Sequence, residues 1–276
     1  MIIKIGQFEI SECWDGVFYK KLSNYPSISQ WELQNIADFI RYEEENGRPC
    51  TVEAEEIILE AIEKYRQNTD RHRIAPPAII RECTACPKYK GCRTDLVCHT
   101  APVENAIQIL DCGSLLSPVL ARNTSAKELQ KESRNAAHDP EDYFRYIMFA
   151  WGNCQAGDRL VMERKLRRFP NEEDLSIHFT PGVRFFFRYD DLSRHPGATF
   201  DGVLPLKVKD EIILRDWVLA IIVPAMYREM LESHVPAELK EKVHYLQKDD
   251  DDIWQWSEKV YEYAKRLGNT GSGLRR

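Results

Sequence analysis

The sequence predicts an α+β fold in which helices flank a mixed β-sheet. Apolar residues recur with helical spacing near both ends of the 276-residue chain, whereas aromatic and β-branched runs typical of strands gather between residues 183 and 223. No stretch repeats itself along the chain. These observations indicate a mixed core that follows a helical N-terminal unit.

The first 75 residues are expected to form that helical unit. After a short strand, Ser29 and Glu32 make a capping box, in which each side chain satisfies a backbone amide at the start of a helix. Apolar residues follow with helical spacing until a glycine and a proline end the run, and a second amphipathic helix is expected from about residue 52 to 67. The polar segment 68–78, with its proline pair, is typical of a linker.

Cap signals predict further helices in the middle of the chain. One is expected from about residue 102 to 112, closed by Gly113 in a left-handed cap. Ser125 and Glu128 open another, and the run Asp-Pro-Glu-Asp at 139–142 opens a third that is expected to end near residue 152. Strands are expected at 183–189, 211–214 and 218–223, and C-terminal helices at 225–233, 237–247 and 253–267. We divide the chain into a helical unit (1–75), a cysteine-rich segment (76–98), a core (99–224), C-terminal helices (225–268) and a disordered tail (269–276).

Composition is that of an ordinary globular protein, with 43% hydrophobic and 30% charged residues. The net charge of −6 gives no global field that would attract nucleic acid, and the basic residues Lys165, Arg167 and Arg168 are most simply a solvated helix end. The longest apolar run, 217–225, is too short to cross a bilayer. We therefore expect no membrane partner.

Four of the eight cysteines stand close together, at Cys83, Cys86, Cys92 and Cys98. Four thiolates make a closed tetrahedral shell, and a C-x-x-C pair lets two sulfurs reach one ion from a tight turn. The later spacing is more typical of a 4Fe-4S cluster than of zinc (Zn), and both metals stay open. Disulfides would require an oxidising compartment. Because the N-terminus has no apolar stretch long enough for a signal peptide, we expect reduced thiols and a cytoplasmic location.

Several common catalytic motifs are absent from the sequence. It contains no P-loop, no G-x-G-x-x-G and no G-x-S-x-G. This argues against P-loop nucleotide hydrolysis, a Rossmann dehydrogenase and the commonest serine hydrolases.

Three short motifs nevertheless follow one another in a characteristic order. The first comprises residues 99–105 (HTAPVEN) and 109–116, which hold an Ile-Leu pair and a glycine-leucine turn. The second is residues 185–189 (FFFRY), and the third is residues 210–214 (DEIIL). The order is similar to that of DarT-like ADP-ribosyltransferases, which show a leading histidine, an aromatic strand followed by an arginine, and a glutamate that begins a hydrophobic strand. The resemblance covers roughly residues 98–224 and implies an ADP-ribosyltransferase-like split mixed sheet.

The chain departs from the family pattern in three respects. Pro102 stands where the family has a second histidine, and no clean double-arginine segment is present, so that Arg122 and Arg134 are the candidates for it. The cysteine cluster and the N-terminal helices lie outside the family's core.

The resemblance implies that NAD is the substrate and that Glu211 is the catalytic carboxylate. Such a carboxylate would hold a ribose hydroxyl and stabilise the positive charge that develops as nicotinamide leaves. Neutral His99 would bind the other ribose hydroxyl, and Arg122 or Arg134 the pyrophosphate. The remaining implied NAD contacts are Thr100, Asn105, Phe187 and Arg188, with the aromatic strand stacking on nicotinamide.

Each of these residues is also compatible with a structural role. Glu211 fits a solvated strand edge, His99 a hydrogen bond near the metal, Phe187 core packing, and Arg188 an ion pair with Asp190 or Asp191. The transferase hypothesis requires His99 and Glu211 to face one cleft. Its acceptor would be DNA or RNA held in a local groove. The alternative is a non-catalytic iron–sulfur or zinc protein that senses redox state or binds a partner, and the sequence does not fix the oligomeric state.

Overall fold

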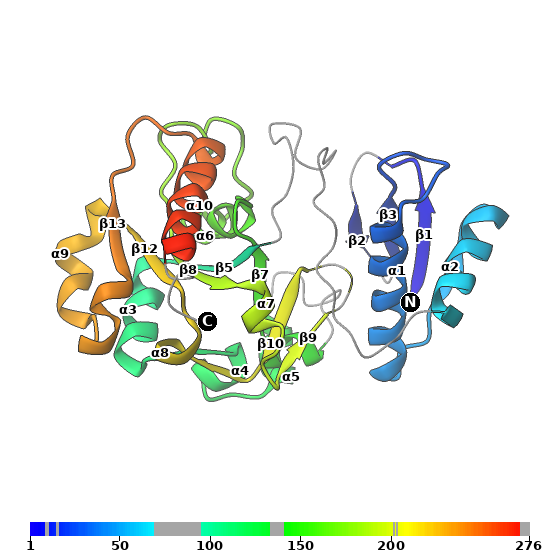
Figure 1. The fold of residues 1–276 in the computed structure, drawn as a ribbon, viewed down its shortest axis with the longest axis horizontal. Coiled ribbons are helices and arrows are strands. Elements are labelled where there is room, and N and C mark those ends of the chain that lie inside the picture. The colour runs from blue at the N-terminus through cyan, green and yellow to red at the C-terminus, as the bar shows by residue number, and fades with distance from the viewer. Residues whose placement is uncertain are drawn as a thin grey trace.

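The computed structural model describes residues 1–8, 11–14, 17–68, 95–132, 141–200, 202 and 204–270. Figure 1 shows a small N-terminal unit, coloured blue, beside a larger unit that contains the rest of the described chain. Within the described residues, the strands form sheets of four, seven and two strands.

The N-terminal unit is a four-stranded sheet with two helices. Its strands follow the order β2-β3-β1-β4, in which β1 runs parallel to β3 and β4 while β2 is antiparallel to β3. Both helices share one hydrophobic cluster with the sheet. The elements are β1 Ile2–Gly6, β2 Glu12–Trp14, β3 Val17–Lys21, α1 Gln30–Glu45, β4 Thr51–Glu53 and α2 Glu56–Asn68.

The two predicted N-terminal helices are present, but the unit is not mainly helical as expected, because the short strand predicted before them belongs to a four-stranded sheet. The Ser29 amide donates to the Glu32 carboxylate over 2.9 Å, as the capping box requires. The strands contain only three to five residues each. Runs this short present one to three inward side chains, too few for their alternation to distinguish a strand from a loop.

The larger unit is built on a mixed seven-stranded sheet of order β13-β12-β8-β5-β7-β10-β9. Strand β5 lies at its centre and is antiparallel to both neighbours, β8 and β7, and only the β12–β13 pair is parallel. The strands are β5 Leu96–Ala101, β7 Tyr146–Trp151, β8 Val183–Arg188, β9 Ala198–Thr199, β10 Leu206–Lys209, β12 Ala220–Pro224 and β13 Val243–Leu246.

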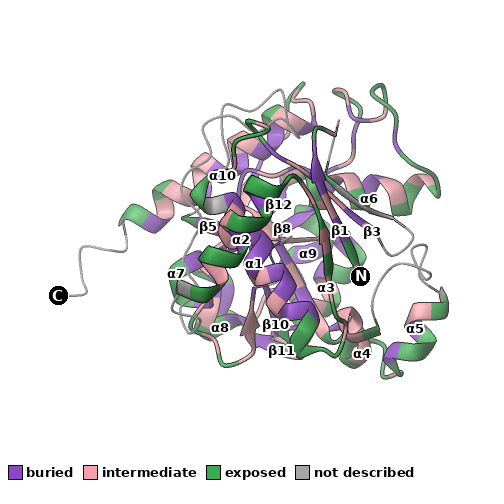
Figure 2. Cartoon of the chain, turned by 90° about the vertical axis from the view of Figure 1, so that its right-hand side faces the viewer, coloured by how far each residue is buried: buried purple, intermediate pink, exposed green. Residues whose placement is uncertain are grey.

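Helices cover both faces of this sheet, and Figure 2 shows the buried segments along the central strands. Successive side chains of a strand point to opposite faces. Cys98 and Phe186 accordingly pack against α6 and α10, whereas Val97 and Phe187 pack against α3, α8 and α9. The helical segments are α3 Val103–Cys112, α4 Pro118–Ala121, α5 Ala126–Glu132, η1 Glu141–Arg145, α6 Ala156–Leu166, α7 Tyr189–Leu192, α8 Leu214–Trp217, η2 Ala225–Tyr227, α9 Arg228–Leu231, η3 Glu232–His234, η4 Ala237–Lys242 and α10 Ile253–Thr270.

A separate two-stranded sheet joins β6 Ser114–Leu116 to β11 Glu211–Ile213. Gly113 ends α3 in the left-handed conformation, as predicted, and leads directly into β6. Strand β11 follows β10 after the single residue Asp210. The chain thus leaves the large sheet at Asp210 and pairs elsewhere.

The structure corrects two predicted helices and two predicted boundaries. Residues expected to form a helix up to 152 make the short η1 and then strand β7. The helix predicted at 237–247 is replaced by the short η4 and strand β13. The boundary at residue 99 falls inside β5, and the C-terminal segment supplies β13 to the same sheet. Residues 95–270 therefore build one unit, and α10 confirms the helix predicted at 253–267. None of the described helices has the length and apolar character that crossing a bilayer requires.

Candidate functional site

His99 is half-buried near the centre of the large sheet, and its surroundings fix its protonation. Its Nδ1 lies 3.1 Å from the carbonyl oxygen of Met148. Because a carbonyl only accepts hydrogen bonds, Nδ1 carries the hydrogen. Burial lowers the pKa of the imidazole, an effect opposed by the Met148 contact and reinforced by the charge of Arg164. The ring is therefore neutral, and its Nε2 is left as a hydrogen-bond acceptor.

Arg164 acts electrostatically on His99, and Arg122 acts in turn on Arg164. Arg164 stands near the end of α6, and Arg122 follows α4. Partial desolvation of its guanidinium lowers the pKa of Arg164, although much of the residue is exposed, and repulsion from Arg122 lowers it further. Arg164 makes no hydrogen bond or ion pair with another residue that the structure describes. Two like charges that repel each other are stabilised by an anion that binds both.

Glu211 is exposed at the start of β11, where it pairs with Leu116 across the small sheet. Asp210, immediately before it, has φ of 65°, a left-handed conformation that is uncommon for residues other than glycine. Two backbone hydrogen bonds hold this turn: the Asp210 amide donates to the Arg145 carbonyl over 2.9 Å, and the Ser117 amide donates to the Asp210 carbonyl over 2.7 Å. Strained residues of this kind concentrate at functional sites.

His99 and Glu211 lie on different sheets. Strand β10, which leads into Glu211, is two places from β5 in the sheet order, a lateral separation of about 10 Å at the usual spacing of strands. No hydrogen bond or ion pair joins the two side chains in the described part of the chain. That both face one cleft remains an expectation.

The other residues of the first motif are placed differently. Thr100 points to the face opposite His99 and packs on α6, where a Cβ added to Gly157 would lie 2.3 Å from the Thr100 hydroxyl oxygen. Asn105 is exposed in the first turn of α3. The structure thus does not bring Thr100 to the face that carries the imidazole.

The aromatic strand has mainly structural contacts. Phe187 has no exposed surface and packs edge-on against Phe149, with ring centroids 5.3 Å apart. Arg188 forms an ion pair with Asp191 at 3.9 Å and donates to the Gly268 carbonyl of α10. Core packing and tethering of α10 are the roles that these contacts support. Arg134 lies outside the described residues.

Cys98 is the only one of the four clustered cysteines that the structure describes, because Cys83, Cys86 and Cys92 lie outside the described ranges. Its thiol is buried, donates to the Trp151 carbonyl over 3.7 Å, and has its pKa raised by burial to about 12. A thiol in such a place loses its proton only beside a cation. Within the described residues no group of three or more side chains could hold a metal ion, so the fit of a metal depends on the other three cysteines. Since His99 points to the opposite face, a hydrogen bond from its ring to the Cys98 sulfur is not made.

Sequence reasoning missed Arg164 and the buried pair that fixes its helix. Asp158 on α6 and Arg184 on β8 are fully buried, and Arg184 Nε donates to the Asp158 carboxylate over 3.0 Å. The Gly182 amide donates to the same carboxylate over 2.8 Å, and Arg184 also donates to Ser257 of α10 over 2.6 Å. No local sequence pattern predicts this network, because its members are far apart along the chain.

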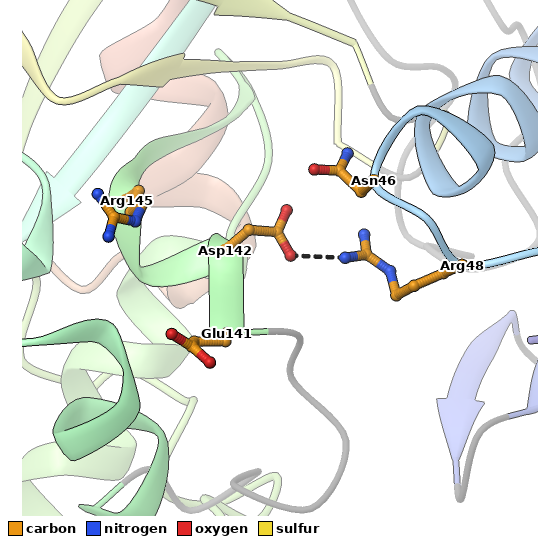
Figure 3. Close-up of a pocket in the computed structure, with 5 residues that line it drawn as sticks. All are labelled: Asn46, Arg48, Glu141, Asp142 and Arg145. Atoms are coloured by element: carbon orange, nitrogen blue, oxygen red, sulfur yellow. Dashed lines mark hydrogen bonds and ion pairs between the residues drawn. The ribbon is translucent and has the colours of Figure 1, made fainter.

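An open pocket of about 400 Å³ lies where the two units meet. Figure 3 shows its lining, across which Arg48 of the N-terminal unit reaches Asp142 of η1 at 2.8 Å. The lining residues are Asn46, Arg48, Glu141, Asp142 and Arg145.

Comparison with known proteins identifies no relative of this chain. No family model matches the chain, and no curated protein or solved structure matches it. The expected resemblance to DarT-like transferases therefore depends on the three sequence motifs alone, and the structure shows a mixed α+β fold.

Proposed function

We propose that this protein is an NAD-dependent ADP-ribosyltransferase. The observation that carries the proposal is the state of His99. Its imidazole is neutral, its Nδ1–H donates to Met148, and its Nε2 has no hydrogen-bond partner among the described residues and could accept from a ribose hydroxyl. The hydrogen-bonding direction of the ring is thus set before a ligand arrives, which reduces the entropy lost on binding.

Positive charge beside this acceptor suits a dinucleotide. Arg122 and Arg164 would hold the pyrophosphate, for which the fork of a guanidinium offers paired donors. The electrostatic coupling of Arg164 to both His99 and Arg122 supports a single site that includes all three.

Glu211 would supply the charge that the reaction needs. The bond between ribose C1′ and the nicotinamide nitrogen breaks, neutral nicotinamide leaves, and C1′ becomes electrophilic. A carboxylate next to the ribose stabilises this positive charge and accepts the proton that the acceptor loses as its bond to C1′ forms. The backbone strain at Asp210 supports a functional place for Glu211.

The acceptor proposed is a base of DNA or RNA. With a net charge of −6, the protein would bind it through a local groove rather than a general basic surface. The cysteine cluster would hold a 4Fe-4S cluster or zinc as a separate structural or regulatory centre.

The test compares Glu211→Gln with Glu229→Gln, a matched change of an exposed glutamate on α9. NAD cleavage and label transfer from NAD to single-stranded oligonucleotides would be measured for both, with NAD titration by calorimetry. We expect Glu211→Gln to lower the cleavage rate by at least about 100-fold, because the lost carboxylate acts on the developing charge, while NAD affinity stays nearly unchanged. Absence of NAD binding by the wild-type protein, or full cleavage by the variant, would refute the proposal.

A second candidate function is a non-catalytic metal protein, and the clustering of four cysteines within sixteen residues favours it. Metal analysis and visible absorption of anaerobically purified protein separate the possibilities. Iron with visible absorption indicates a cluster, and one colourless zinc a structural ion. This candidate replaces the transferase only if metal is present and NAD is neither bound nor cleaved.

A further inference from the structure

One carboxylate of η1 is held by two side chains of the N-terminal unit. The Tyr42 hydroxyl, on α1, donates to Asp142. Arg48 donates to the other oxygen of the same carboxylate over 2.8 Å, as Figure 3 shows. Arg48 is itself fixed by two 2.8 Å contacts with the carboxylate of buried Glu43. The position of η1 is thus coupled to that of α1.

Strand β10 is held by the same helix through a buried lysine. The Lys207 ammonium lies 3.7 Å from the ring centroid of Tyr42, 4.1 Å from that of Tyr143 and 4.7 Å from that of Tyr146, and the residue has no exposed surface. We call these four residues the tyrosine cage. Cations over aromatic faces are attracted most strongly where water is excluded. Because one of the three rings belongs to α1, the cage is complete only while the N-terminal unit is docked.

Both held segments converge on the residue before Glu211. Lys207 is three residues from Asp210 along β10, and the last residue of η1, Arg145, accepts the Asp210 amide through its carbonyl. The left-handed turn at Asp210 is therefore set by two segments that α1 holds in place. A strained turn persists only where its surroundings determine it fully.

We propose that the N-terminal unit positions Glu211, and that Lys207 and Tyr42 are positioning residues for the reaction proposed above. The inference rests on that proposed function. Neither residue touches substrate: they act through η1 and β10 on the direction in which β11 leaves the large sheet. The N-terminal unit is on this view part of the active enzyme and not an appended module.

The experiment uses the full chain with Lys207→Met, Lys207→Arg and Tyr42→Phe, and with Lys240→Met as an exposed control on η4. Hydrogen exchange of residues 208–213, NAD affinity and NAD cleavage are measured for each. We expect Lys207→Met to speed exchange in this segment and to slow cleavage by about tenfold or more, because small displacements of a catalytic group have large effects on rate. NAD affinity should stay within about twofold, since the binding groups lie on β5, α4 and α6. Lys207→Arg, which keeps a cation among the rings, should restore both properties.

Tyr42→Phe keeps the ring of the cage and removes only the bond to Asp142, so it should show the same pattern more weakly. If Lys207→Met does not fold, the Tyr42→Phe variant alone tests whether α1 positions Glu211. Unchanged exchange at 208–213 in both variants would overturn the proposal, as would normal cleavage with faster exchange. If the wild-type protein cleaves no NAD, the proposed function fails, whereas the exchange data still show whether α1 holds the Asp210 turn.

Discussion

At the scale of single residues, two opposing effects decide the state of His99. The hydrogen bond to Met148 raises the pKa of the imidazole, while burial lowers it and is the larger effect. Arg164 acts in the same direction as burial, because a protonated ring would be repelled by its positive charge. The ring is therefore an acceptor at Nε2 throughout the neutral pH range.

This state predicts how ligand binding and stability depend on pH. The pKa of His99 in the folded protein lies below the ordinary value of 6.5, so folding stability contributed by the neutral ring is full above about pH 6.5 and is lost as pH falls toward the lowered pKa. NAD affinity should fall at lower pH, as pH passes through and below the lowered pKa of the folded protein, because protonation converts Nε2 from acceptor to donor.

His99→Asn provides the control for this prediction. The asparagine amide can still donate to the Met148 carbonyl, but nothing replaces Nε2. We expect about tenfold weaker NAD binding at pH 7.5, the loss of one hydrogen bond, and a smaller difference between pH 7.5 and 5.5 than in the wild-type protein. Calorimetric titration of both proteins at the two pH values is the measurement, and an identical pH dependence would contradict the assignment.

At the scale of elements, α6 is the segment on which the cationic site depends. It packs closely on β5, where Gly157 meets Thr100, and it is tied to β8 and α10 through the Asp158–Arg184 pair. Each polar group of this pair has a partner, which is what a buried charge needs. The helix that carries Arg164 is consequently fixed by contacts far from Arg164 itself.

Removal of one partner of this pair should be strongly destabilising. Asp158→Ala leaves the Arg184 guanidinium buried without its counter-ion, and we expect a loss of about 3–5 kcal/mol in the free energy of unfolding. Asp249→Ala, which removes one exposed partner of Lys259, should change it by less than about 1 kcal/mol. Denaturant unfolding of the two variants measures both free energies. Equal losses would show that the buried Asp158–Arg184 pair contributes no more to stability than an exposed ion pair.

At the scale of the whole molecule, two sheets of different size are joined through α1. Besides the tyrosine cage, the backbone at Gly202 approaches this helix so closely that a Cβ there would lie 1.9 Å from the Asn35 carbonyl oxygen. Gly202 also has φ of 77°, where side chains are disfavoured. Docking of the two units thus requires glycine at this position for two reasons.

Gly202→Ala tests the contact between the units, with Gly47→Ala as its matched control. Both glycines have left-handed φ values, but a Cβ at Gly47 would meet nothing within 4 Å. The conformational penalty of about 1–2 kcal/mol is common to both variants. Only Gly202→Ala should in addition increase hydrogen exchange in α1 and separate the unfolding of the two units in a thermal scan. Equal behaviour of the two variants would mean that the close approach is not needed.

How far the sequence predicted this molecule depended on how local each signal was. The capping box at Ser29 and the glycine that ends α3 are local, and both were predicted correctly. Strand β7 was predicted as helix because the preceding residues, Asp-Pro-Glu-Asp at 139–142, are typical of a helix start. It forms a strand because it pairs with β5 and β10, which are distant along the chain. Arg164 could not be predicted for the same reason, since its electrostatic effect on His99 depends on where the fold places the end of α6. The cysteine site stays a prediction from the sequence.

The tyrosine cage also bears on how the protein can be divided for study. A fragment that begins at residue 95 would retain the complete seven-stranded sheet, and sheet topology alone would recommend that cut. It would also remove one wall of the cage and expose a lysine ammonium with the faces of Tyr143 and Tyr146. Truncation at residue 95 would therefore expose an aromatic patch that promotes non-specific association of the fragment.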